Sequence, residues 1–211
     1  FESTALVRQA FECAVTVQWV GHNPLAPAAL ANEYARMRTN LKANLMTSGS
    51  EIFRRGAADI EIDAPPLIGA DFKDRARNFK RLTMEFDPPN NDLYVQYASL
   101  SDPSHASFKV MDRYVAVPEN DRIALGRYDE PVLPPAYLLW TTARSVIWAA
   151  MAVYYLERDK AWRKELLAFA KEVGTGADLE LNAKAKWDAD RKLAALAKEA
   201  KATRLRDDTA R

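Results

Sequence analysis

The sequence predicts an all-α protein: a bundle of about six or seven helices with a short irregular or hairpin insertion at residues 111–130. Two observations predict this fold. Apolar side chains recur at steps of three and four over long segments, which is the spacing of one helix face. Prolines separate these segments, with breaks at positions 24, 65–66, 88–89 and 134–135. Hydrophobic residues make up 48% of the 211 positions, which is enough for a sizeable core.

The first half of the chain predicts three helices. Residues 2–21 form an apolar helix, and residues 28–46 form an amphipathic one. The stripe that we expect this second helix to bury consists of Leu30, Tyr34, Met37, Leu41 and Leu45. Residues 71–86 predict a charged helix, whose apolar side consists of Phe72, Ala76, Phe79 and Leu82.

The middle of the chain predicts two further helices around the insertion. Asp92 is a suitable cap for a helix that runs to about Ser101. Residues 111–130 contain short β-type runs and fit a loop or small hairpin better than a helix. Residues 136–156 are the most apolar helix, and their length would span a bilayer. Arg144 lies at the centre of that helix, where a charge is costly in lipid, so we expect a core helix and no membrane partner.

The C-terminal part has a different composition, rich in Ala, Lys, Glu and Leu from residue 159 onward. It predicts an amphipathic helix that Gly174 ends, followed by a long charged helix at 178–206. We therefore expect a helical bundle core at 1–174 and a charged helical extension at 175–211. The extension is interpreted as a solvated helix, with a partner-binding or coiled-coil arm as the alternative.

The composition also limits the classes of function. Thirty basic residues and twenty-nine acidic ones give no overall field that would attract nucleic acid or an anionic membrane. Cys13 is the only cysteine, so neither an intrachain disulfide nor a cysteine zinc site can form, which suits a cytoplasmic location. The two histidines have no metal-ligand spacing, and glycines are few. We therefore expect no metal and no cofactor.

Two charged positions on apolar helices are candidates for a buried ion pair. Arg8 and Glu12 lie one helical turn apart, either as a surface pair or on a face that another element covers. Arg144 has Trp140 four residues before it and Trp148 four residues after it, and indole rings stack on a guanidinium. Because a buried charge needs a partner, we predict that Arg144 pairs with Glu12. The alternative is an arginine that extends to the bundle surface.

A second candidate cluster comes from residues 97–107, which read YASLSDPSHAS. Ser101 and His105 would share a face if the helix continued, but Pro103 predicts that it ends in a turn. We expect His105 to form a polar cluster with Glu12 and Ser101 and to hold the following loop on the first helix. The alternative is proton transfer by the histidine. A serine hydrolase would also need an orienting carboxylate and an oxyanion site.

The order of these segments resembles a family of uncharacterised bacterial all-helical proteins, a domain of unknown function whose fold is similar to HEPN-type helical bundles. The resemblance covers roughly residues 3–156 and is carried by LVRQAFECAVTVQWV, by YASLSDPSHAS, and by a proline before a long apolar helix. The positions that match the family are Arg8, Glu12, Ser101 and His105. Active HEPN ribonucleases carry an arginine a few residues before a histidine. This chain lacks that spacing, since the nearest arginine before His105 is Arg81.

Three functions follow as expectations. The first is a non-catalytic binding or regulatory domain that assembles with a protein partner, in bacterial stress or phage defence. The second is a metal-independent, HEPN-like ribonuclease that uses Arg8, Glu12 and His105, with RNA as its partner. The third is a structural module that forms homodimers through the C-terminal helices. We favour the first, because the sequence contains no complete catalytic motif.

Overall fold

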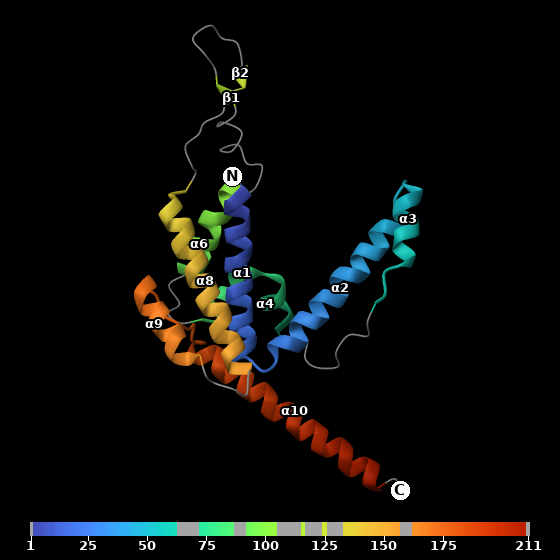
Figure 1. Cartoon of the computed structure of the whole chain (residues 1–211). Coiled ribbons are helices and arrows are strands. Elements are labelled where there is room, and N and C mark those ends of the chain that lie inside the picture. The colour runs from blue at the N-terminus through green and yellow to red at the C-terminus, as the bar shows by residue number, and fades with distance from the viewer. Residues whose placement is uncertain are drawn as a thin grey trace. The chain divides into compact units, whose positions relative to one another are not determined.

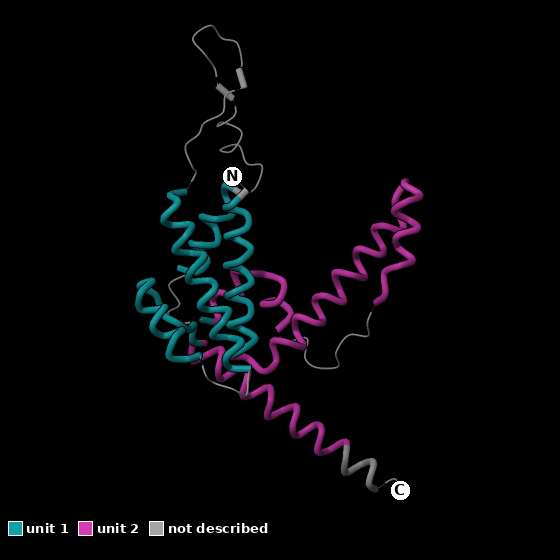
Figure 2. The backbone as a smooth tube through the Cα atoms, in the orientation of Figure 1, with its two compact units in different colours: residues 1–21, 86–180 teal, residues 22–85, 181–211 magenta. Residues whose placement is uncertain are grey.

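The computed structural model describes residues 2–62, 72–86, 92–104, 115–116, 124–125, 133–156 and 162–209 (Figure 1). The all-α prediction is confirmed: the described ranges contain nine α-helices, of which seven have eight residues or more. Their internal contacts form two compact units (Figure 2). Unit 1 is Phe1–Gly21 with Phe86–Glu180, and unit 2 is His22–Glu85 with Leu181–Arg211. The expected division at residue 174 stays a prediction.

Unit 1 is built on α1 (Glu2–His22) and α8 (Pro135–Leu156), two long helices that lie side by side (Figure 1). Its elements are α1 (Glu2–His22), α6 (Asp92–Ser101), a 3-10 turn (Asp102–Ser104), strands β1 (Val115–Ala116) and β2 (Ala124–Leu125), α8 (Pro135–Leu156) and α9 (Arg163–Val173). Its large buried apolar side chains include Phe11, Val15 and Trp19 of α1, Phe86, Leu100 of α6, and Ile147, Trp148 and Met151 of α8. Burial of these side chains supplies most of the drive to fold unit 1.

Two predicted features of unit 1, a helix end and a small hairpin, are matched by the local backbone. Gly174 ends α9 with φ of 71°, the left-handed conformation that favours glycine, and its N–H bonds to the last turn of the helix. Within the predicted insertion, Val115 pairs with Leu125 and Ala116 with Ala124 in an antiparallel ladder. The other residues of 111–130 lie outside the described residues.

Unit 2 contains α2 (Ala26–Met46), α3 (Glu51–Ala58), α4 (Lys73–Arg77), α5 (Phe79–Thr83) and α10 (Ala183–Thr209). The prediction of one helix over 71–86 is wrong, because the segment breaks at Asn78. This residue has extended backbone angles, φ −129° and ψ 104°, and its side-chain oxygen accepts a hydrogen bond from the Arg81 N–H at 3.2 Å. Asparagine competes with helical hydrogen bonding in this way, so it caps a new helix instead of continuing the old one.

The second helix forms as predicted, but its buried face is not the one expected. Tyr34, Met37 and Leu41 are 51–58% exposed. The buried residues of α2 are instead Ala26, Ala29, Glu33 and Ala35. Small side chains let neighbouring backbone approach this arc closely, and Arg77 of α4 reaches across to Glu33 at 2.7 Å. The face of α2 that is buried in unit 2 therefore lies beside the predicted apolar stripe. Three large side chains of that stripe are largely exposed to solvent.

Candidate functional site

Arg144, near the middle of α8, is a buried cation surrounded by aromatic rings. It is 5% exposed, and its guanidinium carbon lies 4.1 Å from the ring centre of Trp140 and 4.4 Å from that of Trp148. Phe11 of α1 adds a third ring at 5.6 Å. Residues four apart share one helix face, so the i−4 and i+4 spacing places both indoles against the cation. Each such contact stabilises a desolvated guanidinium.

The polar partner of Arg144 is Gln96 of α6, and not Glu12 as the sequence suggested. A terminal nitrogen of Arg144 donates a hydrogen bond to the side-chain oxygen of Gln96. Glu12 instead lies 4.0 Å from Arg8, one turn away on its own helix, with about a third of its side chain exposed. The helical rotation explains the difference: Phe11 faces the guanidinium, so the next residue points to another side of α1.

The cation is therefore buried without a carboxylate among its described contacts. Burial lowers the pKa of Arg144 to about 10, against a smaller opposing effect of Tyr137. The guanidinium thus remains charged at neutral pH. Its Nε is also buried without a hydrogen-bond partner in the described part of the chain. Aromatic faces and one neutral amide hold this cation, which makes it a structural group rather than an exposed anion receptor.

The two indoles that flank Arg144 also connect α8 to the end of α9 and to the segment that follows it. The Nε1 of Trp140 donates to the Val173 carbonyl at 3.0 Å. The Nε1 of Trp148 donates to the Gly176 carbonyl at 2.9 Å. A buried indole N–H needs an acceptor, so each tryptophan has both a stacking role and an anchoring role.

Gln18 of α1 completes this arrangement and was not singled out from the sequence. Its amide nitrogen donates to the Trp148 carbonyl at 2.7 Å, and its amide oxygen accepts from the Leu179 N–H at 3.1 Å. The side chain is fully buried. The available signal was one amide between apolar neighbours in the first helix, a position where a buried polar group must be hydrogen-bonded on both sides.

The four candidates Arg8, Glu12, Ser101 and His105, expected from the sequence, are brought together only in part. Arg8 lies over the ring of Tyr97 with 5.7 Å to its centre, and Ser101 donates a hydrogen bond to the Tyr97 carbonyl at 2.7 Å. Tyr97 therefore links two of the four candidates across α1 and α6. The Ser101 hydroxyl is used within its own helix, a common role for a helical serine. His105 lies outside the described residues, so its cluster with Glu12 and Ser101 stays a prediction.

Two further features of the described residues bear on a metal site and on a membrane span. These residues include no group of three or more His, Cys, Asp or Glu side chains that could hold a metal ion. Among them, α8 alone is long and apolar enough to cross a membrane by length and composition, a criterion that core helices also meet. The contacts of Arg144 and both tryptophans within unit 1 favour a core helix.

In comparisons with protein-family models, curated proteins and solved structures, nothing matches this chain. The fold and the site together define an all-helical protein whose central cation is held by aromatic rings and amides.

Proposed function

We propose that the chain is a non-catalytic helical binding domain that assembles through exposed apolar side chains of α2 and α3. These side chains, named here the α2–α3 apolar face, are Tyr34, Met37, Leu41, Met46, Ile52 and Phe53, and each is more than half exposed. Exposed apolar residues that gather on adjoining helices mark interaction sites, whereas isolated ones are ordinary. This exposure is the observation that supports the proposal.

The α2–α3 apolar face belongs to a helical pair whose geometry is fixed by polar contacts. The two helices pack against each other within unit 2. Just after α3, the Glu61 carbonyl accepts a hydrogen bond from Arg38 at 2.7 Å, and the Ile60 carbonyl accepts one from Lys42 at 3.1 Å. The basic residues of α2 thereby hold the chain that leaves α3. A preordered surface loses less conformational entropy on binding, which favours assembly.

The partner that fits this face best is a second copy of the chain. Residues 26–62 carry five basic side chains and four acidic ones, so their net charge is only +1. These are Arg36, Arg38, Lys42, Arg54 and Arg55 against Glu33, Glu51, Asp59 and Glu61. In a two-fold dimer the same surface meets itself, so a strongly charged face would repel its copy. A nearly neutral face with an apolar centre satisfies that requirement.

The test is the mass of the full chain in sedimentation and light scattering over a wide concentration range. We expect a dimer whose dissociation shifts to much higher concentration in Met37→Lys and Leu41→Lys. Val146→Lys is the matched control, because Val146 is an exposed apolar residue on α8 of the other unit. It should assemble like the original chain. A monomer at all concentrations, or a dimer unaffected by Met37→Lys, would refute the proposal.

The two alternatives predict different results in the same experiments. Dimers formed through the C-terminal helices should survive Met37→Lys and weaken in Trp187→Lys, since Trp187 is an exposed side chain of α10. A HEPN-like ribonuclease, suggested by the family pattern at Arg8, Glu12, Ser101 and His105, should cleave RNA without added metal. Cleavage lost in His105→Ala but kept in His22→Ala would overturn the non-catalytic proposal.

A further inference from the structure

Unit 2 contains a cavity of about 410 Å³ between the start of α4 and the first half of α10. The residues that line it are Phe72, Arg75, Asp188, Arg191, Lys192 and Ala195. We propose that this cavity binds a small molecule that carries a phosphate group on a compact apolar body. The cavity is formed by α4 and α10, so the proposal is independent of the α2–α3 apolar face.

The charges of the lining favour an anion. Arg75, Arg191 and Lys192 contribute three positive charges and Asp188 one negative charge, which leaves +2. Asp188 accepts a hydrogen bond from Lys184 at 2.6 Å and lies 4.0 Å from Arg191. Outside the lining, Lys184 beside Asp188 and Glu85 beside Arg75 carry opposite charges that offset each other, so the net charge of +2 is kept.

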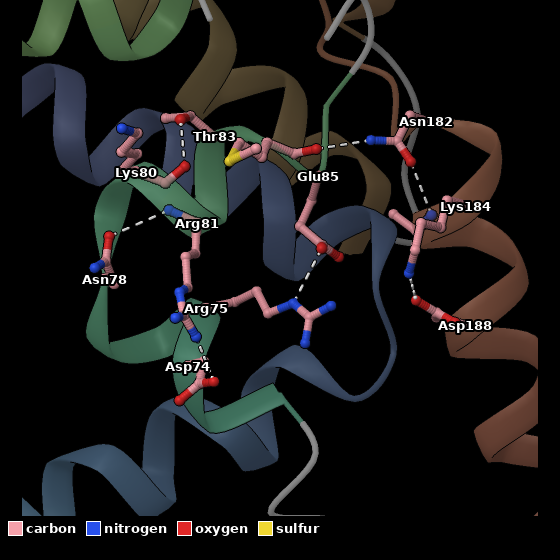
Figure 3. A network of polar contacts seen from close by, with 12 residues as sticks. Asp74, Arg75, Asn78, Lys80, Arg81, Thr83, Glu85, Asn182, Lys184 and Asp188 are labelled. Carbon is pink, nitrogen blue, oxygen red and sulfur yellow. Dashed lines mark hydrogen bonds and ion pairs between the residues drawn. The ribbon is translucent and has the colours of Figure 1, made fainter.

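Arg75 is oriented toward the cavity by its own neighbours. Its Nε donates to a carboxylate oxygen of Glu85 at 3.0 Å, and its guanidinium lies 5.4 Å from the ring centre of Phe72. Figure 3 shows Arg75 hydrogen-bonded to Glu85, and Lys184 hydrogen-bonded to Asp188 on α10. An arginine fixed through Nε presents its terminal nitrogens in a set direction, the geometry in which guanidinium groups bind phosphate oxygens.

The opposite wall is similarly ordered. The guanidinium of Arg191 lies 4.6 Å from the ring centre of Trp187, one turn earlier on α10. Stacking of this kind limits the motion of a long side chain and so reduces the entropy lost on binding. Phe72 and Ala195 supply apolar surface beside the cations. A ligand that fits this lining has an anionic head and a small apolar body.

Phosphate fits the lining better than carboxylate for two reasons. A phosphate monoester is close to a dianion at neutral pH, which matches the +2 of the lining. Two guanidinium groups can also donate to three phosphate oxygens, whereas a carboxylate offers only two. The volume lies within the roughly 300–1,000 Å³ typical of small-molecule sites.

The test is calorimetric titration of the full chain at low ionic strength with phenyl phosphate, inorganic phosphate and benzoate. We expect phenyl phosphate to bind most tightly, inorganic phosphate less tightly, and benzoate least. Arg191→Gln and Lys192→Gln should each weaken phenyl phosphate about tenfold, because each removes one charge-assisted hydrogen bond. Lys198→Gln is the control, an exposed lysine of the same helix outside the lining, and should bind like the original chain.

Two further variants make the outcome decisive. Asp188→Asn should tighten phenyl phosphate, because it removes the carboxylate from the lining. Met37→Lys should bind normally even where it is monomeric, which separates this site from the proposed assembly. Absence of phenyl phosphate binding, tighter binding of benzoate, or equal affinity in Arg191→Gln, Lys192→Gln and Lys198→Gln would overturn the proposal. Circular dichroism of each variant confirms that it is folded.

Discussion

Arg144 of α8 donates a hydrogen bond to Gln96 of α6, so the buried cation of unit 1 is matched to a neutral amide. Two tryptophan rings and one phenylalanine ring surround the same guanidinium. An amide cannot cancel the charge, and burial accordingly lowers the pKa of this arginine to about 10. The Arg144 guanidinium is stabilised by contacts that depend on exact geometry. The stability of unit 1 is therefore sensitive to the loss of any one of them.

The first prediction compares Gln96, the observed partner of Arg144, with Glu12, the partner expected from the sequence. Gln96→Ala should lower the free energy of unfolding by about 1–3 kcal/mol, because it leaves a buried guanidinium N–H unpaired. Glu12→Gln should change it by less than about 0.5 kcal/mol, since its pair with Arg8 at 4.0 Å is partly exposed. Urea unfolding at neutral pH measures both. A larger effect of Glu12→Gln would contradict this assignment of the partner.

The aromatic spacing around Arg144 could be predicted from the sequence, because positions four apart on one helix always share a face. The identity of its polar partner could not. Glu12 lies on α1 and Gln96 on α6, and the rotation of each helix about its axis decides which side chain meets the cation. That rotation depends on how Phe11 packs, which is a tertiary property.

A second prediction concerns acid stability in unit 2. Glu33 is buried on α2, and its hydrogen bond with Arg36 lowers its pKa; burial opposes this, while Arg77 adds to the lowering. A carboxyl whose pKa is lower in the folded state stabilises the fold above its ordinary pKa of 4.5. That stabilisation should disappear as the pH falls below 4.5 and passes through the lowered value. Thermal unfolding between pH 7 and pH 3 measures it.

Glu33→Gln should lose stability at neutral pH and show a shallower decline in acid. The control is Glu51→Gln, whose pair with Arg55 is largely exposed. It should follow the original chain to within about 0.5 kcal/mol at every pH. If Glu33→Gln retained the full acid dependence, the lowered pKa of Glu33 would not be its source.

The exposed stripe of α2 illustrates a different limit of the sequence. Leu30, Tyr34 and Met37 follow the spacing of a buried helix face, and the helix does form over Ala26–Met46. Periodicity predicts that a face is apolar, but it does not say what covers it. The face of α2 that is buried in unit 2 contains alanines and an ion-paired glutamate. Because this face has low hydrophobicity, the sequence pattern predicts that it is exposed to solvent.

A third prediction follows from the N-terminus of α10. The side-chain oxygen of Asn182 accepts from the Ala185 N–H at 2.9 Å, while its amide nitrogen donates to the Met84 carbonyl at 2.7 Å. Asn182→Ala should destabilise by about 1–2 kcal/mol, since it removes a helix cap and a second hydrogen bond. Asn182→Asp should lose less, because a carboxylate still caps the helix. Urea unfolding ranks the variants, and equal losses would show that the cap is not the main contribution.

The last prediction concerns the ion pair between Glu85 and Arg75, the pair that orients Arg75 at the cavity of unit 2. Arg75 donates to one carboxylate oxygen of Glu85, and the other oxygen is buried with no hydrogen-bond partner among the described residues. Removing the arginine would leave a buried carboxylate with its charge uncompensated. Arg75→Met should therefore destabilise by roughly 2–4 kcal/mol. This is somewhat less than the roughly 3–5 kcal/mol for breaking a fully buried pair, because a quarter of the Arg75 side chain is exposed.

The double variant Arg75→Met with Glu85→Gln distinguishes charge from packing. If the cost of Arg75→Met comes from the isolated carboxylate, the added Glu85→Gln should restore about half of the loss or more, because a neutral amide is far cheaper to bury. Arg81→Met is the matched control: its pair with Asp74 at 2.5 Å is about half exposed and should contribute less than about 1 kcal/mol. Urea unfolding of the original chain, Arg75→Met, Glu85→Gln and the double variant completes a mutant cycle. A double variant that is no more stable than Arg75→Met would assign the loss to the contact of Arg75 with the Phe72 ring instead.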